Sequence, residues 1–204
     1  CHQNLIAHFQ RPKEFGPRAL GGRSIIGDAH SLEMQSIMNL KTKFRESFRP
    51  FAPSVLREKA AAYFDLDAES PYMLLVSQVR ENHIHPASRG AEAQGIDKLK
   101  IERSTIPAVT HVDYSARIQT VARETSPVFY EIIQSFYDLT GCPVIINTSF
   151  NIRGEPIVCT PEDAYRCFMC TNMDYLVMER YVFAKENQPD KDKFKKDDIS
   201  IELD

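Results

Sequence analysis

The sequence has no long apolar run and no large net charge, and both absences exclude classes of protein. Its 204 residues carry 25 Lys and Arg against 28 Asp and Glu, which gives a formal net charge of −3. That balance does not favour bulk attraction to nucleic acid or to an anionic membrane. No apolar run reaches the ~20 residues that span a bilayer, and residues 1–10 lack the pattern of a signal peptide. We therefore expect neither a nucleic-acid nor a membrane partner.

Cysteine is scarce, and its spacing is irregular. An odd set of five does not indicate a disulfide framework and favours a reducing cytoplasm; the five are Cys1, Cys142, Cys159, Cys167 and Cys170. Cys167 and Cys170 have the spacing of half a zinc site, but no second pair follows. We predict buried structural thiols on a helix, solvated side chains at His83 and His85, and no metal site.

What the sequence does contain is enough apolar material for a buried core. Hydrophobic residues make up 43% of the chain, which suits a single domain with a small extension. The chain does not begin with Met and enters a Gly- and Arg-rich motif almost at once. We therefore expect a fragment of a longer polypeptide.

Predicted strands alternate with predicted helices, which indicates an α/β or α+β domain. Caps, prolines and apolar periodicity favour helices over 32–38, 54–63 and 127–140, with another that begins at Thr160-Pro161. Strands are expected over 72–79, 106–112, 144–146 and 175–184. The remaining segments are expected to be a glycine-rich turn over 13–30, a basic loop over 43–53, a mobile loop over 80–106, and a flexible charged tail over 186–204.

A basic cluster over 43–51 interleaves Lys43, Arg45 and Arg49 with phenylalanines and is followed by prolines. A solvated charged face is the plain interpretation of such a run. The prolines stiffen the backbone, however, and the phenylalanines indicate partial burial, where cations need anionic partners. Arginine forks and a lysine point charge are both suited to phosphate.

Two polar clusters follow predicted strands. Residues 147–156 place Asn147 and Ser149 directly after a buried strand, where ligands of α/β proteins commonly bind. The alternative is an Asx/Ser turn that satisfies its own backbone. Residues 111–117 hold His111 and Asp113, for which the plain alternative is a structural hydrogen bond.

Taken together and in order, these motifs resemble the C-terminal half of the O-carbamoyltransferase family, which acts on nodulation factors and antibiotics. The resemblance covers residues 9–185 and rests on Phe-Gly-Pro-Arg-Ala-Leu-Gly (15–21), Phe-Arg-Pro-Phe-Ala-Pro (48–53), Pro-Ala-Val-Thr-His-Val-Asp (107–113), the run 147–156 and Thr-Pro-Glu-Asp-Ala (160–164). Two departures stand out: Arg11-Pro12 replaces the usual Gly-Arg, and the polar segment 81–105 is longer than in the family.

The resemblance implies a YrdC-like fold, that is, a twisted mixed sheet flanked by helices. It implies a linker motif over 1–30, the YrdC-like domain over 31–185, and the tail over 186–204. In such proteins this domain makes carbamoyl-adenylate from carbamoyl phosphate and ATP, and Mg²⁺ could accompany the nucleotide. A metal-binding N-terminal domain of the same polypeptide then transfers the carbamoyl group to a hydroxyl acceptor.

The same resemblance implies the roles of individual residues. Lys43, Arg49 and Arg117 would neutralise phosphate charge as the catalytic cations. Ser149 would donate to phosphate with Asn147 positioning it, and Met73 would line the carbamoyl end or serve in the core. Arg18 and Arg45 are candidates for nucleotide phosphates. No general base is evident, and phosphoryl transfer depends mainly on positioning and electrostatics.

Two other functions stay open at this point. The domain could be a non-catalytic module that holds nucleotide or carbamoyl phosphate for its partner domain. It could also be an RNA-binding relative of the YrdC type, although the net charge of −3 argues against this. A homodimer is open as well, and the acceptor cannot be read from these residues.

Overall fold

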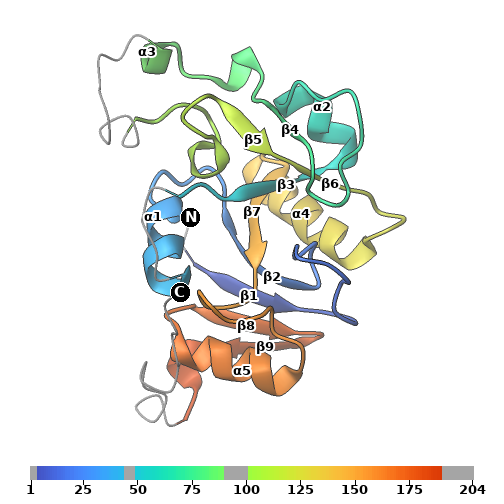
Figure 1. Cartoon of the computed structure of the whole chain (residues 1–204), viewed down its shortest axis with the longest axis vertical. Coiled ribbons are helices and arrows are strands. Elements are labelled where there is room, and N and C mark those ends of the chain that lie inside the picture. Colours follow the sequence, from blue (N-terminus) through green and yellow to red (C-terminus); the bar gives the residue numbers. More distant parts are fainter. Residues whose placement is uncertain (1–3, 44–48, 90–100, 190–204) are drawn as a thin grey trace. The chain divides into compact units, whose positions relative to one another are not determined.

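A mixed sheet organises the protein (Figure 1). The computed structural model describes residues 4–43, 49–89 and 101–189. Seven strands follow the order β6-β3-β7-β2-β1-β8-β9, helices flank the sheet, and β4 and β5 pair separately. The predicted α/β (α+β) class with a mixed sheet flanked by helices is confirmed.

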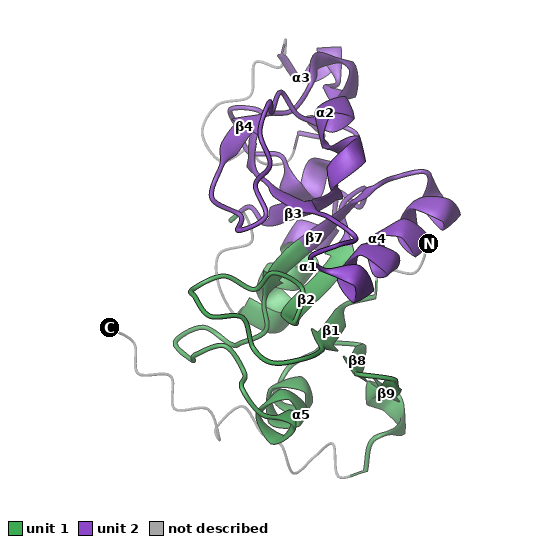
Figure 2. Ribbon diagram, turned by 90° about the vertical axis from the view of Figure 1, so that its right-hand side faces the viewer, with its two compact units in different colours: residues 1–27, 36–49, 147–204 green, residues 28–35, 50–146 purple. Residues whose placement is uncertain are grey.

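The chain divides into two compact units, coloured separately in Figure 2. Unit 1 comprises residues 1–27, 36–49 and 147–204, and unit 2 comprises residues 28–35 and 50–146. Strand β7 (Val144–Ser149) begins in unit 2 and ends in unit 1.

Unit 1 is built on β1 (Ile6–Phe9), which pairs antiparallel with β2 (Arg23–Asp28) and parallel with β8 (Tyr175–Met178). Strand β9 (Tyr181–Ala184) adds to β8 as an antiparallel hairpin. Helix α5 (Pro161–Cys170) packs on β1 and β8. Its first turn is closed by a capping box, because the Thr160 hydroxyl accepts from the Asp163 amide and the Asp163 carboxylate accepts from the Thr160 amide.

Unit 2 holds the parallel pair β3 (Ala52–Leu56) and β6 (Gln119–Val121), and the antiparallel pair β4 (Val76–Gln78) and β5 (Ser115–Arg117). Its helices are α2 (Ala60–Tyr63), α3 (Pro86–Arg89) and α4 (Pro127–Thr140). Helix α1 (Met34–Met38) begins in unit 2 and continues in unit 1 into a π-helical turn, Asn39–Lys43. Short 3₁₀ turns lie at Arg57–Lys59, Glu81–His83, Pro107–Val109 and Lys185–Asn187.

The glycine-rich loop between β1 and β2 is closed by one carboxylate. Glu14 Oε1 accepts from the amides of Gly22 (2.5 Å) and Leu20 (3.2 Å). A Cβ at Gly22 would lie 2.9 Å from that oxygen, so the glycine allows the close approach. Beside it the buried Arg23 guanidinium lies 3.4 Å from the centre of the Phe9 ring, and burial lowers its pKa. The backbone of the loop is thus held at its base.

The strongest local signals gave correct predictions. Helix α4 spans 127–140 as predicted, and Gly141 ends it with φ +76°, a left-handed conformation that glycine adopts without strain. Helix α5 begins after its Thr160 cap as predicted. The buried strand over 144–146 is present and extends through Ser149 as β7.

Two element predictions in unit 2 were wrong, one because of strand pairing and the other because of local hydroxyl bonds. Residues 54–56 belong to strand β3 rather than to a helix, since Ser54 pairs with Gln119 of β6 and all of β3 is buried. Only Ala60–Tyr63 is α-helical. The strand expected over 106–112 is a 3₁₀ turn at Pro107–Val109, because the Ser104 and Thr110 hydroxyls bond to the Ile106 backbone.

Further boundaries also differ. Residues 72–79 form a strand only at Val76–Gln78, because Met73 has φ +56° and breaks the extended backbone. The strand over 175–184 is the hairpin β8–β9, turned at Glu179 with φ +52°. Glu179 is held there by Gln10 and Arg11, whose side-chain and backbone N–H groups donate to it. Strands β1, β2, β5 and β6 were not predicted; β2 lies within the expected 13–30 turn.

Some predictions lie partly outside the described residues, which exclude 1–3, 44–48, 90–100 and 190–204. These include Arg45, the middle of the 80–106 loop and most of the 186–204 tail. The linker role of 1–30 and the likeness to YrdC stay predictions. None of the helices in the described ranges has the length and apolar character that a bilayer crossing requires.

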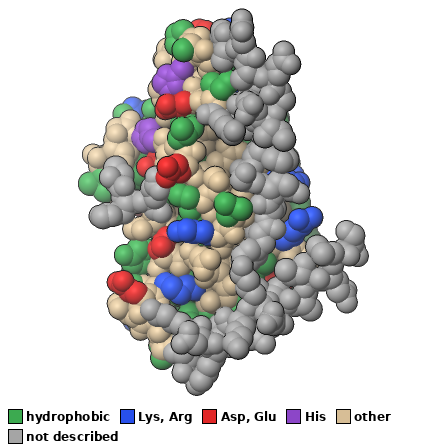
Figure 3. All heavy atoms as spheres, turned by 90° about the vertical axis from the view of Figure 1, so that its left-hand side faces the viewer, with side chains coloured by type: hydrophobic (Ala, Val, Ile, Leu, Met, Phe, Trp, Pro, Cys, Tyr) green, Lys and Arg blue, Asp and Glu red, His purple; other side chains and the backbone are tan. Residues whose placement is uncertain are grey.

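Charged side chains are dispersed on the face shown in Figure 3. Visible Lys and Arg side chains of the described residues lie apart, among acidic, polar and apolar atoms. This distribution agrees with the formal net charge of −3. A local pocket is therefore the place to look for concentrated positive charge.

One ion pair in unit 2 makes stability depend on pH. His30 Nδ1 lies 3.2 Å from Asp28 Oδ1, and this hydrogen bond, with a second from Cys142, raises the His30 pKa to about 10. Because the folded-state pKa is above the unfolded value of 6.5, the stabilisation is complete below pH 6.5 and is lost as the pH rises toward 10. We predict that Asp28→Asn flattens this decline, measured by urea unfolding at pH 6, 8 and 10. Parallel curves for the two proteins would contradict the assignment.

Candidate anion-binding site

A small pocket in unit 1 gathers cations from distant segments. Its volume is ≈ 160 Å³, and its lining residues are Lys43, Arg49, Thr148, Ser149, Asn151, Ile152 and Arg153. Three predicted site residues, Lys43, Arg49 and Ser149, are thus brought together. None of the described residues that line the pocket is acidic, so its positive charge is not neutralised within the lining.

Lys43 builds the pocket floor from the end of the π-helical turn, a feature often found at functional sites. The residue is only 5% exposed. Its ammonium donates to the Ser149 carbonyl (2.5 Å) and hydroxyl (3.3 Å). It also donates to the Asn151 carbonyl (2.9 Å) and Oδ1 (2.7 Å). These four oxygens are neutral, so the hydrogen bonds hold the ammonium without cancelling its charge.

The turn that follows β7 is also bonded to itself. The Ser149 hydroxyl donates to Asn151 Oδ1 (2.6 Å), and Asn151 Nδ2 donates to the Glu155 carbonyl (2.7 Å). The Phe150 side chain is fully buried, and its amide donates to the Arg23 carbonyl (2.9 Å). The same residues therefore form a turn that satisfies its own hydrogen bonds and also line the charged pocket.

Arg49 contributes an exposed side chain on a fixed backbone. The side-chain amide of the buried Asn39 donates to the Arg49 carbonyl at 2.8 Å. Asn39 lies in the same π-helical turn as Lys43. One turn thus places both cations at the pocket.

The other predicted site residues lie elsewhere. Asn147 is 1% exposed and does not line the pocket; its Nδ2 donates to the Ala19 carbonyl (3.1 Å) beside the exposed Arg18. Arg117 ends β5 and Met73 is buried, both in unit 2. Arg45 lies outside the described residues. The proposed roles of these residues stay predictions.

Sequence analysis missed four lining residues: Thr148, Asn151, Ile152 and Arg153. All belong to the polar run 147–156, which was identified as a cluster without assigning a role to each member. The signal that could have found them is the mostly polar run after a buried strand, which leads into a turn at Gly154. Arg153 alone adds a cation to the site.

The remaining candidates make local contacts or are buried. His111 and Asp113 share a serine, because Ser115 Oγ donates to Asp113 Oδ1 (2.7 Å) and lies 3.4 Å from His111 Nδ1. Burial lowers the His111 pKa, so the ring is neutral at pH 7. Cys167 and Cys170 are buried in α5 as predicted, and burial raises the Cys167 pKa to about 12.

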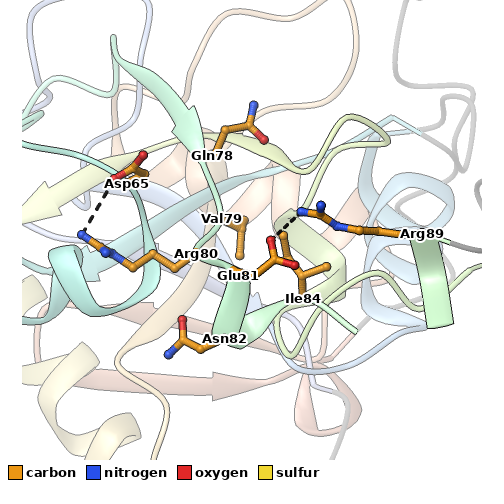
Figure 4. A pocket seen from close by; sticks show the side chains of 8 residues that line it. All are labelled: Asp65, Gln78, Val79, Arg80, Glu81, Asn82, Ile84 and Arg89. Atoms are coloured by element: carbon orange, nitrogen blue, oxygen red, sulfur yellow. Dashed lines mark hydrogen bonds and ion pairs between the residues drawn. The ribbon is translucent and has the colours of Figure 1, made fainter. Parts of the chain in front are cut away.

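A second, larger pocket of ≈ 570 Å³ lies in unit 2 (Figure 4). Its two arginines are each paired with an acid: Arg80 with Asp65 at 3.8 Å, and Arg89 with Glu81 at 2.5 Å. Figure 4 shows these pairs as separate contacts at different parts of the pocket. Since the charges cancel pairwise, the smaller pocket of unit 1 is the better anion site.

Comparison with known proteins decides the family. The family described as Carbamoyltransferase C-terminus matches residues 1–185. The chain belongs to this carbamoyltransferase C-terminal family. The resemblance inferred from the sequence motifs is therefore confirmed.

Relatives of this carbamoyltransferase C-terminal domain are much longer than the chain. The uncharacterized protein sll1178 of Synechocystis is 60% identical over 98% of this chain, which spans 33% of that protein. Nodulation protein NolO of Bradyrhizobium diazoefficiens is 40% identical over 89% of the chain, which spans 30% of it. Nodulation protein U of Rhizobium tropici is 36% identical over 85% of the chain, which spans 26% of it. The chain thus spans a third or less of these relatives.

We predict that Lys43→Met destabilises this carbamoyltransferase C-terminal domain by about 2 to 4 kcal/mol, because half-buried oxygens of Ser149 and Asn151 lose their donor. Lys41→Met is the control in the same turn and is expected to cost less than about 0.5 kcal/mol. Urea unfolding of both variants measures the difference. Equal stability of the two would show that the buried ammonium does not hold the turn.

Proposed function

We propose that the unit 1 pocket binds the phosphate group of carbamoyl phosphate. The observation that carries this proposal is the meeting of Lys43, Arg49 and Arg153 with the Ser149 hydroxyl in a lining whose described residues include no acid. Charged donors bind phosphate oxygens more strongly than neutral donors do. A partly enclosed site also strengthens their electrostatic attraction.

The size of the pocket supports a small anion. Its ≈ 160 Å³ corresponds to about five water molecules at roughly 30 Å³ each. Drug-sized ligands occupy pockets of about 300–1,000 Å³. A compact phosphate compound such as carbamoyl phosphate fits this volume, whereas most of an ATP molecule would extend beyond it.

In the proposed reaction, the carbamoyl unit passes to the α-phosphate of ATP and gives carbamoyl-adenylate, while phosphate and pyrophosphate leave and one water is consumed. Lys43 and Arg49 stabilise charge on the phosphate oxygens, and Ser149 donates to them once its hydroxyl turns away from Asn151 Oδ1. Arg117 and Met73, which belong to unit 2, keep their predicted roles as a catalytic cation and a lining of the carbamoyl end, and Asn147 is proposed to position Ser149. Arg18, Arg45 and Mg²⁺ are proposed for the nucleotide. Transfer to a hydroxyl acceptor is assigned to a metal-binding domain in the remainder of the polypeptide.

One alternative belongs to a different class of function. The Lys43 ammonium already donates hydrogen bonds to Ser149 and Asn151. This arrangement also suits a site that holds an anion without converting it to a product. A non-catalytic binding module would bind carbamoyl phosphate with the same residues. It would show no turnover.

ATP/pyrophosphate exchange that depends on carbamoyl phosphate tests the proposal in the polypeptide that carries this chain. We expect exchange in the wild type and a loss of at least 100-fold, about 2.7 kcal/mol of transition-state stabilisation, in Arg49→Ala. Lys43→Ala should lose as much exchange activity. Because Arg49 is exposed, Arg49→Ala is the variant expected to keep the fold. Arg180→Ala, a change on the β8–β9 turn, is the charge-matched control. Binding without exchange would favour the non-catalytic module.

A further inference from the structure

Arg153 stands at the corner of a tight turn that is fixed at both ends. The Glu155 amide donates to the Ile152 carbonyl (3.2 Å), and Asn151 Nδ2 donates to the Glu155 carbonyl (2.7 Å). Gly154 has φ +82°, as the third residue of a type II turn requires. Ile152 is 1% exposed and anchors the turn. The backbone of Arg153 is therefore held in place by the residues on either side of it.

The Arg153 side chain is exposed and lines the same pocket as the exposed Arg49. Lys43 differs from both, because its buried ammonium is directed at oxygens of Ser149 and Asn151. A guanidinium presents its N–H donors as a planar fork that matches two phosphate oxygens. Two such forks at one small pocket suit a phosphate group, which presents several oxygens, better than a carboxylate with two.

We propose that Arg153 is a phosphate ligand and forms a two-arginine clamp with Arg49, while Lys43 positions the turn and adds its charge. This inference rests on the proposed function and names the part of the substrate that the pocket recognises: a terminal phosphate group. The carbamoyl end then extends beyond the clamp. Selection should be for small phosphate compounds over small carboxylates of the same size.

Isothermal titration of the 204-residue chain with carbamoyl phosphate and with inorganic phosphate, at fixed ionic strength, tests the clamp. Arg153→Ala is expected to weaken both ligands at least tenfold. Arg153→Lys should recover part of the lost affinity, because lysine keeps the positive charge but cannot form the two parallel hydrogen bonds of a guanidinium. Arg180→Ala removes the same charge from unit 1 away from this turn and should change affinity by less than twofold. Acetate should bind at least tenfold more weakly than phosphate.

Gly154→Ala tests whether phosphate binding depends on the position of Arg153 as well as on its charge. A Cβ at Gly154 meets nothing within 4 Å, so the substitution acts through its positive φ alone. We expect severalfold weaker phosphate binding with no change in net charge. Unchanged affinity in Gly154→Ala would contradict a fixed placement of Arg153.

The outcomes separate this inference from the proposed function. If Arg153→Ala matches Arg180→Ala while Arg49→Ala loses binding, the clamp is overturned and the proposed phosphate pocket stands. If the wild type binds neither carbamoyl phosphate nor phosphate, the proposed function itself fails. Arg153 is exposed, so its removal should leave the urea unfolding curve unchanged, which excludes loss of the fold as the cause.

Discussion

The contact between the Lys43 ammonium and the oxygens of Ser149 and Asn151 is the constraint on which the site depends. It joins residues 106 and 108 positions apart in the chain. Burying a charge is costly unless its donors are satisfied. Four neutral oxygens accept hydrogen bonds from them here. The same interaction therefore shapes the turn and makes the pocket attractive to anions.

The rest of unit 1 supports that contact from two sides. Strand β7 ends in the buried Phe150, which bonds to the Arg23 carbonyl and accepts from the Val158 amide at 3.0 Å. The π-helical turn carries Lys43 and fixes Arg49 through Asn39. Polar residues thus follow a buried strand at its carboxyl end, the location at which α/β proteins commonly bind ligands. The site belongs to the packing of the unit, and the charged side chains complete it.

Local chemistry predicted the elements whose ends carry strong signals. Helix α4 between Ser126-Pro127 and Gly141, helix α5 after Thr160, and the apolar β7 depend on caps, proline, glycine and continuous burial. Strand β3 was mispredicted because strand pairing overrides local helix propensity. The turn at Pro107 was mispredicted because the hydroxyls of nearby Ser104 and Thr110 bond to the Ile106 backbone. Met73 and Glu179 break predicted strands through a positive φ, which composition does not reveal.

The candidate site was predictable in part for the same reason. Lys43, Arg49 and Ser149 stood out by charge, by their polar context and by family motifs, and the fold brings them together. Arg153 resembled an ordinary solvated turn residue, since only the fold places its turn at the pocket. The Lys43 hydrogen bonds could not be foreseen, because backbone carbonyls from a distant turn supply half of them.

The central claim is that the unit 1 pocket is where a small phosphate compound binds. Titration of the ¹⁵N-labelled chain with carbamoyl phosphate, followed by backbone amide shifts, tests it most directly. The account predicts that the largest saturable shifts occur at Arg49 and over residues 149–154. Largest shifts at the Arg80 and Arg89 pocket of unit 2, or no saturable shifts at millimolar ligand, would contradict it.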